Sequence, residues 1–167
     1  MKKIIYLIIV MSLFLVSCNK SEKAVKIDDE LLNKFPRDAQ AILKNANPDL
    51  VTIDYLVENA DNYAVEFDTD RNDFFVVLKG TVTEITTTDY SKEDLSILEN
   101  DDAIEIMKNT LYFDYRIDDS ETTIGKSISI GEDEPKIKLE KEYYFFIIVT
   151  EIVDKYNFSI VNYFNLN

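Results

Sequence analysis

The chain has 167 residues, of which 18 are Lys or Arg and 32 are Asp or Glu, so its formal net charge is −14. This excess of acids argues against nucleic acid as a ligand, because phosphate binding depends on clustered Lys and Arg. The sequence has no His and a single Cys, Cys18, which excludes His-based catalytic triads, His-based zinc sites and an internal disulfide.

The N-terminal residues have the pattern of an export signal. Two lysines precede residues 4–15, which are apolar except for Ser12. This run is shorter than the roughly 20 apolar residues that a membrane-spanning helix needs. It fits the apolar region of a secretory signal peptide, which follows a basic start.

The end of this segment, Leu15-Val16-Ser17-Cys18, resembles the lipobox of bacterial lipoproteins. The resemblance implies signal-peptidase cleavage between Ser17 and Cys18, and a diacylglycerol plus an N-acyl chain on Cys18. Two acyl chains hold a protein firmly at a membrane. Asn19 follows the cysteine where an inner-membrane retention signal has Asp, so the outer membrane is favoured if the organism has one. The alternatives are an ordinary secretory leader with an unrelated cysteine, or an uncleaved anchor.

Cleavage would divide the chain into a leader and one domain. The leader is 1–17, followed by the lipidated cysteine and a polar tether at 18–26. A helical segment at 27–62 then packs on an antiparallel β-rich body at 63–167. Because two lysines and no acids leave with the leader, the remaining chain would have 16 basic and 32 acidic residues, a formal charge of −16. Its 150 residues are enough for one domain with a sizeable core.

Residues 27–62 have the signals of short helices. Asp28 can cap a first helix, because a side-chain oxygen there accepts a hydrogen bond from an otherwise unpaired backbone N–H. Pro36 interrupts this helix and starts a second one, since proline fits the first turn of a helix but not its interior. Thr52 can cap a third helix after a turn at 47–49.

From residue 63 onwards, alternation with a period of two predicts strands. The clearest covers 110–118, with one apolar and one polar face. A buried strand covers 74–87, in which Gly80 marks a bulge or sharp bend. Residues 143–153 are apolar on both faces for most of their length, so both faces must be covered. Further strands are predicted at 127–130, 136–140 and 158–166, with Ile130 and Leu139 pointing inward.

The order of these elements predicts an α+β fold. Ser91, followed three residues later by Asp94, predicts the start of a helical insertion near 91–108, and Asn100-Asp101 offers a place where this helix can break. Tight turns between the strands predict antiparallel pairing. The helices are therefore expected to pack on a strongly coiled antiparallel sheet or a small open barrel. The long coiled strand with an internal glycine and the later run at 143–152 loosely resemble an OB-type barrel.

The acidic turns offer one candidate metal site. Asp68, Asp70 and Asn72 have the spacing of oxygen ligands in a calcium loop. However, Asp73 stands where an EF-hand needs Gly, and Lys79 stands where it needs a bidentate Glu. A looser calcium site and an ordinary solvated turn are the two interpretations, and the turn is favoured. No other cofactor is expected.

The polar face of strand 110–118 offers a candidate contact surface. Tyr112 lies on this face beside Asp114 and Arg116. A tyrosine flanked by these charges suits contact with a protein or a sugar, although the same set is also an ordinary group of cross-strand neighbours.

These observations favour a non-catalytic binding module at the cell envelope, attached to the membrane by its lipid. A protein or a glycan of the envelope is the expected partner. The alternatives are a hydrolase that uses carboxylates or calcium, and a structural or inhibitory envelope subunit.

Overall fold

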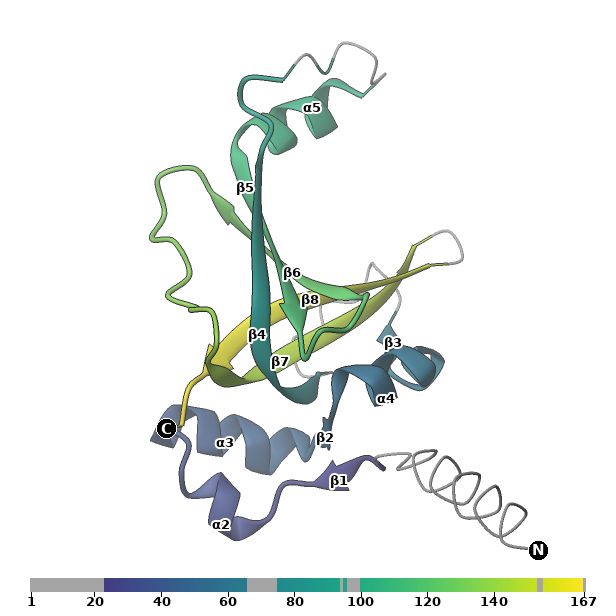
Figure 1. Ribbon diagram of the computed structural model, residues 1–167, viewed down its shortest axis with the longest axis vertical. Coiled ribbons are helices and arrows are strands. Elements are labelled where there is room, and N and C mark those ends of the chain that lie inside the picture. The colour runs from purple at the N-terminus through teal and green to yellow at the C-terminus, as the bar shows by residue number, and fades with distance from the viewer. Residues whose placement is uncertain (1–22, 66–74, 94, 96–99, 153–154, 167) are drawn as a thin grey trace, which may run out of the picture.

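The computed structural model describes residues 23–65, 75–93, 95, 100–152 and 155–166 (Figure 1). These residues form one eight-stranded sheet in the order β1-β2-β4-β5-β6-β8-β7-β3, in which β4 also pairs with β7. The strands are β1 (Val25–Lys26), β2 (Asp49–Val51), β3 (Ala64–Val65), β4 (Val76–Asp89), β5 (Thr110–Ile117), β6 (Thr123–Ser129), β7 (Glu142–Ile152) and β8 (Lys155–Phe164).

The second pairing of β4 closes five strands into a ring. The ring runs β4-β5-β6-β8-β7 and returns to β4, which makes a closed five-stranded, OB-like barrel. The predicted α+β fold with a small barrel is confirmed, and the barrel is closed. The predicted antiparallel pairing is found in β4–β5, β4–β7, β5–β6 and β7–β8, whereas β2–β4, β3–β7 and β6–β8 are parallel. Each of the parallel pairs is separated by enough chain for a crossover, which tight turns alone do not reveal.

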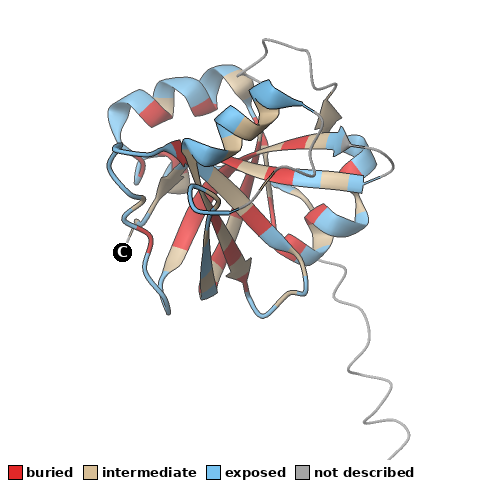
Figure 2. Cartoon of the chain, turned by 90° about the horizontal axis from the view of Figure 1, so that it is seen from above, coloured by how far each residue is buried: buried red, intermediate tan, exposed pale blue. Residues whose placement is uncertain are grey.

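The inward faces of the barrel strands form the main core. On β5, Phe113, Tyr115 and Ile117 are buried and alternate with half-buried polar neighbours, as the sequence predicts. On β7, Phe145 and Ile147 are completely buried. Figure 2 shows the buried residues on the strands and on the inner sides of the helices, with exposed residues on the outer sides of the helices. Burying each large apolar side chain contributes about 1.5–3 kcal/mol.

A second apolar layer covers the outer face of β7. The helices α2 (Asp29–Leu32) and α3 (Arg37–Ala46) lie beneath the barrel in Figure 1. Phe35, between them, contacts Tyr144, Phe146 and Phe164, with ring centroids 5.4, 6.2 and 5.7 Å away. This layer explains why β7 is apolar on both faces.

The predicted helix signals in the N-terminal segment are confirmed. Asp28 Oδ1 accepts a hydrogen bond from Leu31 N at 2.8 Å, and α3 begins directly after Pro36. Thr52 caps α4 (Ile53–Glu58), which is followed by the short helix η1 (Ala60–Asn62). The strands β1 and β2 were not predicted, because two or three residues are too short to show a period. None of the helices in the described residues is long and apolar enough to cross a membrane.

Gly80 allows a close approach inside the barrel. A Cβ atom at this position would lie 2.2 Å from Ile117 Cγ2 and 2.7 Å from Asp118 Oδ2. Just beyond it, the register between β4 and β5 shifts between Val82 and Glu84. The glycine therefore marks the place where β4 coils closely against the end of β5, as its position in the predicted strand suggested.

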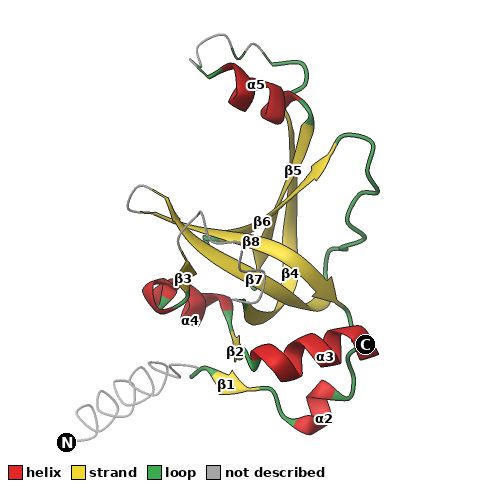
Figure 3. Ribbon diagram, turned by 180° about the vertical axis from the view of Figure 1, so that it is seen from behind, coloured by secondary structure: helices red, strands yellow, loops and turns green. Residues whose placement is uncertain are grey.

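Beyond the barrel, β4 and β5 continue as a ribbon, with the end of β6 paired along β5, and carry α5 (Asp101–Lys108); we call the ribbon and α5 the arm (Figure 3). The predicted start of this helix at Ser91 is wrong. Ser91 N donates to Asp89 Oδ1 at 2.8 Å in a turn, and α5 begins after Asn100, whose Oδ1 accepts from Ala103 N at 3.0 Å. Asn100, and not Ser91, therefore caps the first turn of α5.

Residues 130–141, which we call the strap, run from β6 to β7 without forming the predicted strand at 136–140. Instead of a ladder, two of its backbone N–H groups donate to tyrosine hydroxyls: Lys136 N to Tyr163 Oη at 2.8 Å and Lys138 N to Tyr143 Oη at 3.0 Å. Ile137 between them is buried in the barrel core. Because the strap does not alternate, Leu139 and Ile130 are exposed, contrary to prediction.

Candidate functional site

Most predicted site residues lie outside the described part of the chain. These are Ser17 and Cys18 of the lipobox, and Asp68, Asp70 and Asn72 of the candidate calcium turn. Among the residues that are described, no group of three or more His, Cys, Asp or Glu is placed to hold a metal ion.

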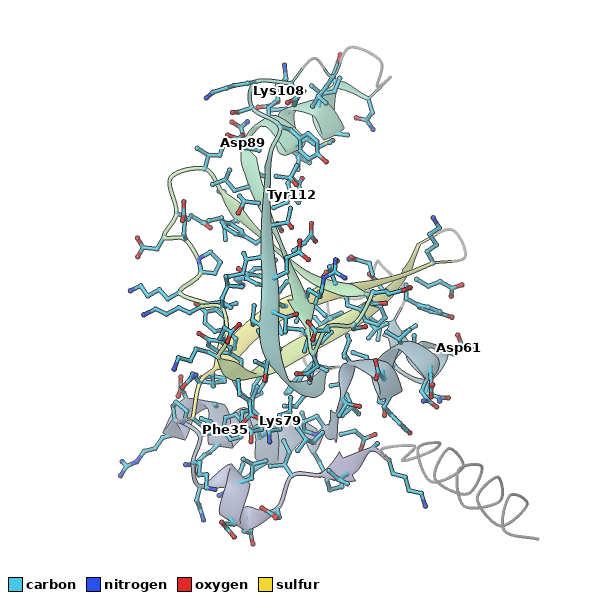
Figure 4. All side chains as sticks on the ribbon, in the orientation of Figure 1. Phe35, Asp61, Lys79, Asp89, Lys108 and Tyr112 are labelled. Atoms are coloured by element: carbon cyan, nitrogen blue, oxygen red, sulfur yellow. The ribbon has the colours of Figure 1, made fainter. Side chains whose placement is uncertain are left out.

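The predicted contact residues share one face of β5. Tyr112, Asp114 and Arg116 are each half-buried and alternate with core residues. The ring of Tyr112 packs edge-to-face on Tyr90, with centroids 5.7 Å apart, and Figure 4 shows Tyr112 on the arm, below Asp89 and Lys108. Tyr90 follows β4 directly, so β4 and β5 jointly hold this aromatic pair.

Arg116 is already engaged by its own chain. Its Nε lies 2.7 Å from Glu84 Oε2 across the β4–β5 ladder, and its Nη1 donates to Ser120 O at 3.2 Å. The ion pair is partly exposed, so its contribution to stability is small. Together the two contacts hold the turn after β5 in place. Arg116 therefore positions this turn at the edge of the contact surface.

Asp114 lies in a recess at the seam of the barrel. The ring closes between β6 and β8 through a single residue pair, Gly125 with Ser159. Asp114 stands opposite Gly125, and its Oδ1 is the nearest atom, at 3.6 Å, to where a Cβ of Gly125 would be. The recess has a volume of about 250 Å³ and is lined by Tyr112, Phe113, Asp114, Gly125, Lys126, Ser127, Asn157, Ser159 and Ile160.

The recess is polar and contains one carboxyl group. Burial raises the pKa of Asp114 above its ordinary value, because desolvation disfavours the charged form. Lys126 Nζ donates to Ile160 O across the seam at 3.4 Å, and Asn157 Nδ2 donates to Ser159 Oγ at 2.9 Å. Hydroxyl, amide and carboxyl groups thus converge on a small volume, an arrangement that suits recognition of a polar ligand.

The sequence predicted only the β5 side of this recess. Asn157 and Ser159 alternate with the buried Phe158 and Ile160, which places them on the outer face of β8. The alternation was visible in the sequence, but it did not reveal that β8 lies beside β6. Lys126 was also missed, because it lies on the inward-facing row of β6 and reaches the seam by its length.

A larger open depression of about 1030 Å³ lies between the strap and the end of β8. Lys136, Lys138 and Lys141 line it together with Tyr143 and Tyr163. The tyrosine hydroxyls on its wall fasten the strap, so the depression follows from the way the strap covers this end of the barrel.

No protein-family model matches this chain, and no curated protein matches it either. The class of the protein is therefore defined by its fold: a small, closed, OB-like barrel with an arm on its first two barrel strands. In barrels of this type, the face of the second and third strands is a common ligand-binding surface, and here those strands are β5 and β6.

Proposed function

We propose that this protein is a lipid-anchored binding module of the bacterial cell envelope, which recognises a protein or glycan without catalysing a reaction. The observation that carries the proposal is the recess on the outer face of β5, β6 and β8. It joins the predicted contact residues Tyr112 and Asp114 to hydroxyl and amide groups from a distant strand.

The composition of the recess supports a polar, uncharged ligand. Tyr112 offers an aromatic face, while Ser127, Asn157 and Ser159 offer hydrogen-bond donors and acceptors. Sugar hydroxyls and peptide groups match this set, since both give and accept hydrogen bonds. Nucleic acid does not match it, because the chain carries a net charge of −14 and the recess contains a carboxyl group.

The anchor is tested with Cys18→Ala. We expect the wild-type protein to fractionate with membranes, and the variant to be released or to keep its leader. Without the thiol no thioether to diacylglycerol forms, and the two acyl chains that give stable anchoring are lost. Wild-type size and membrane fractionation in the variant would contradict the proposed lipidation.

The recess is tested by photo-crosslinking in cells. A photoreactive residue in place of Ser127 is expected to form one prominent adduct with an envelope protein or glycan. The same residue in place of Val57, an exposed position on α4, serves as the control. Tyr112→Ala should reduce the Ser127 adduct and leave the fold intact, as measured by its melting temperature. Equal adducts at both positions, or no effect of Tyr112→Ala, would argue against the recess.

A hydrolase remains the second candidate because Asp114 is a carboxyl group whose pKa is raised by burial, as general acids require. Glycoside hydrolysis needs a second carboxylate about 5–9 Å away. Among the described residues that line the recess, Asp114 is the one carboxylate. A bound calcium ion would offer another way to catalyse hydrolysis. Calcium binding is tested by measuring the melting temperature of the protein with and without the ion. A ligand at 100 times its Kd adds about 2.7 kcal/mol, so an unchanged melt would argue against a calcium-dependent enzyme.

A further inference from the structure

The helix α5 exposes an apolar side chain on the arm. Asp102, Glu105, Ile106 and Asn109 follow the spacing of one helix face, and no residue of α5 is buried. Ile106 is 62% exposed, the largest exposed fraction among the exposed large apolar side chains of the described residues. Ile106 lies on the polar side of the helix, opposite the half-buried stripe of Ala103, Ile104 and Met107, so it is an apolar side chain outside the stripe that an amphipathic helix turns toward its core.

This helix face forms one wall of a groove. The opposite wall is the start of the strap, directly after β6, where Ile130 is 48% exposed. The groove has a volume of about 540 Å³ and is lined by Asp102, Glu105, Ile106, Asn109, Thr110, Ser129 and Ile130; we call this surface the arm patch. Two exposed isoleucines from separate elements therefore face one groove.

The groove is held open by hydrogen bonds. Thr110 Oγ1 donates to Ile106 O at 2.7 Å, and Ile130 N donates to Asn109 O at 2.9 Å. Thr110 pairs with Ser129 in the β5–β6 ladder, which forms the floor. Gly131 follows with a φ of 101°, a conformation that glycine adopts without strain. The two walls are thus preorganised, which lowers the entropy cost of binding.

The charged side chains that line the groove are both acidic. Asp102 and Glu105 line it, and neither forms an ion pair with any residue that the structure describes. Such a rim complements a basic partner, and the net charge of −14 attracts one over a longer range. A second copy of the chain would place acids against acids in a symmetric contact, and an anionic bilayer would repel the same rim.

The position of the arm also favours a protein partner. Figures 1 and 3 place α5 at one end of the molecule and β1, through which the chain enters the described domain, at the other. If the chain is anchored before β1, the arm patch faces away from the membrane. This step rests on the proposed anchor, whereas the groove and its charges do not.

We infer that the arm patch is a docking surface for a partner protein, which binds through a basic segment whose apolar residue inserts between Ile106 and Ile130. The apolar contact supplies affinity, and the acids select a partner with Lys or Arg on either side of that residue. The arm patch and the recess share no lining residue, and they follow one another along β5 and β6, where Thr110 and Ser129 of the patch lie two residues from Tyr112 and Ser127 of the recess.

Photo-crosslinking of the full-length protein in cells tests the inference. A photoreactive residue replaces Ile130, and its adduct is compared between otherwise wild-type protein, Ile106→Ser, and the double variant Asp102→Asn/Glu105→Gln. The matched control is Ile42→Ser, since Ile42 on α3 is 45% exposed and lies outside the arm. Both arm variants change exposed residues, so each should melt like the wild type.

We expect one protein adduct, reduced at least fivefold by Ile106→Ser and by the double variant and unchanged by Ile42→Ser. Mass spectrometry should place the crosslink in a segment with Lys or Arg beside an apolar residue. No adduct, an adduct with lipid or a second copy, an acidic partner segment, or no effect of the arm variants would each overturn the inference. The two proposals are told apart by the variants: Tyr112→Ala should reduce the adduct of the recess, and Ile106→Ser that of the arm patch.

Discussion

The barrel and the arm are built from the same two strands but differ in what holds them. Inside the barrel, β4 and β5 each have further partners, and residues such as Val77, Leu78 and Ile117 are completely buried. Beyond the barrel, β4 pairs with β5 and β5 with the end of β6, and no residue of α5 is fully buried. The apolar side chains Ala103, Ile104 and Met107 of α5 are only half-buried, so the arm has little core of its own and depends on the barrel. Exposed groups on the arm are therefore free to serve binding.

The sharpest test of this difference compares two apolar truncations. Phe145→Ala in the barrel core should lower the free energy of unfolding by about 3–5 kcal/mol, because it removes a completely buried ring and leaves a cavity. Ile106→Ser on the arm should stay within about 0.5 kcal/mol of the wild type. Urea unfolding measures both values, and a large loss in Ile106→Ser would show that α5 belongs to the core.

A second comparison asks whether the strap belongs to the barrel. Ile137→Ala should lower the free energy of unfolding by about 2–3 kcal/mol, since its side chain is 7% exposed and fills one end of the core. Leu139→Ala, two residues along and 51% exposed, should change it by less than about 0.5 kcal/mol. Equal effects in a thermal melt would mean that Ile137 does not close the barrel.

Two glycines in the barrel strands allow a matched test of close packing. Gly80→Ala should cost about 1–3 kcal/mol, because the added Cβ overlaps Ile117 and Asp118. Gly125→Ala should be tolerated, since its nearest neighbour is at an ordinary contact distance of 3.6 Å. The Gly125 variant narrows the recess beside Asp114, so it should retain its melting temperature and lose the Ser127 crosslink. If Gly80→Ala melted at the same temperature as the wild type, the close approach of Ile117 and Asp118 would not require glycine at this position.

The smallest expected effects are two pH dependences of opposite sign. The raised pKa of Asp114 in the barrel recess means that the folded state prefers the protonated form. Ionisation of Asp114 therefore lowers the stability of the folded state. This loss is absent below the unfolded pKa of about 3.9 and complete above the folded pKa. Asp114→Asn should therefore melt higher than the wild type at pH 7, and the difference should vanish near pH 3.

Asp89, at the end of β4 on the arm, should behave in the opposite way. Hydrogen bonds from Ser91 lower the pKa of its carboxyl group, so the ionised form stabilises the folded state and this stability disappears as the pH falls through the folded pKa. Asp89→Asn should thus melt slightly lower than the wild type at pH 7 and like it in acid. Melting curves that shift in the same direction for both variants would contradict the assigned environments.

Local chemistry was predicted well from the sequence. The caps at Asp28 and Thr52 follow from the fact that a side-chain oxygen satisfies an N–H only a few residues away. The alternation of β5 also predicted its polar face, because successive side chains of a strand point to opposite sides. Where local signals competed, as at Ser91, the outcome depended on which hydrogen bond each backbone group found.

By itself, the sequence determined the lipobox resemblance, the acidic charge, the helix caps and the two faces of each long strand, because all of these depend on neighbours along the chain. Only the tertiary structure decided that the barrel closes between β6 and β8, which brings Asn157 and Ser159 beside Asp114, and that Ile106 and Ile130 face one groove. Those pairings join segments that are distant in the chain. Their register is set by how the apolar faces pack together, and a local pattern does not contain that information.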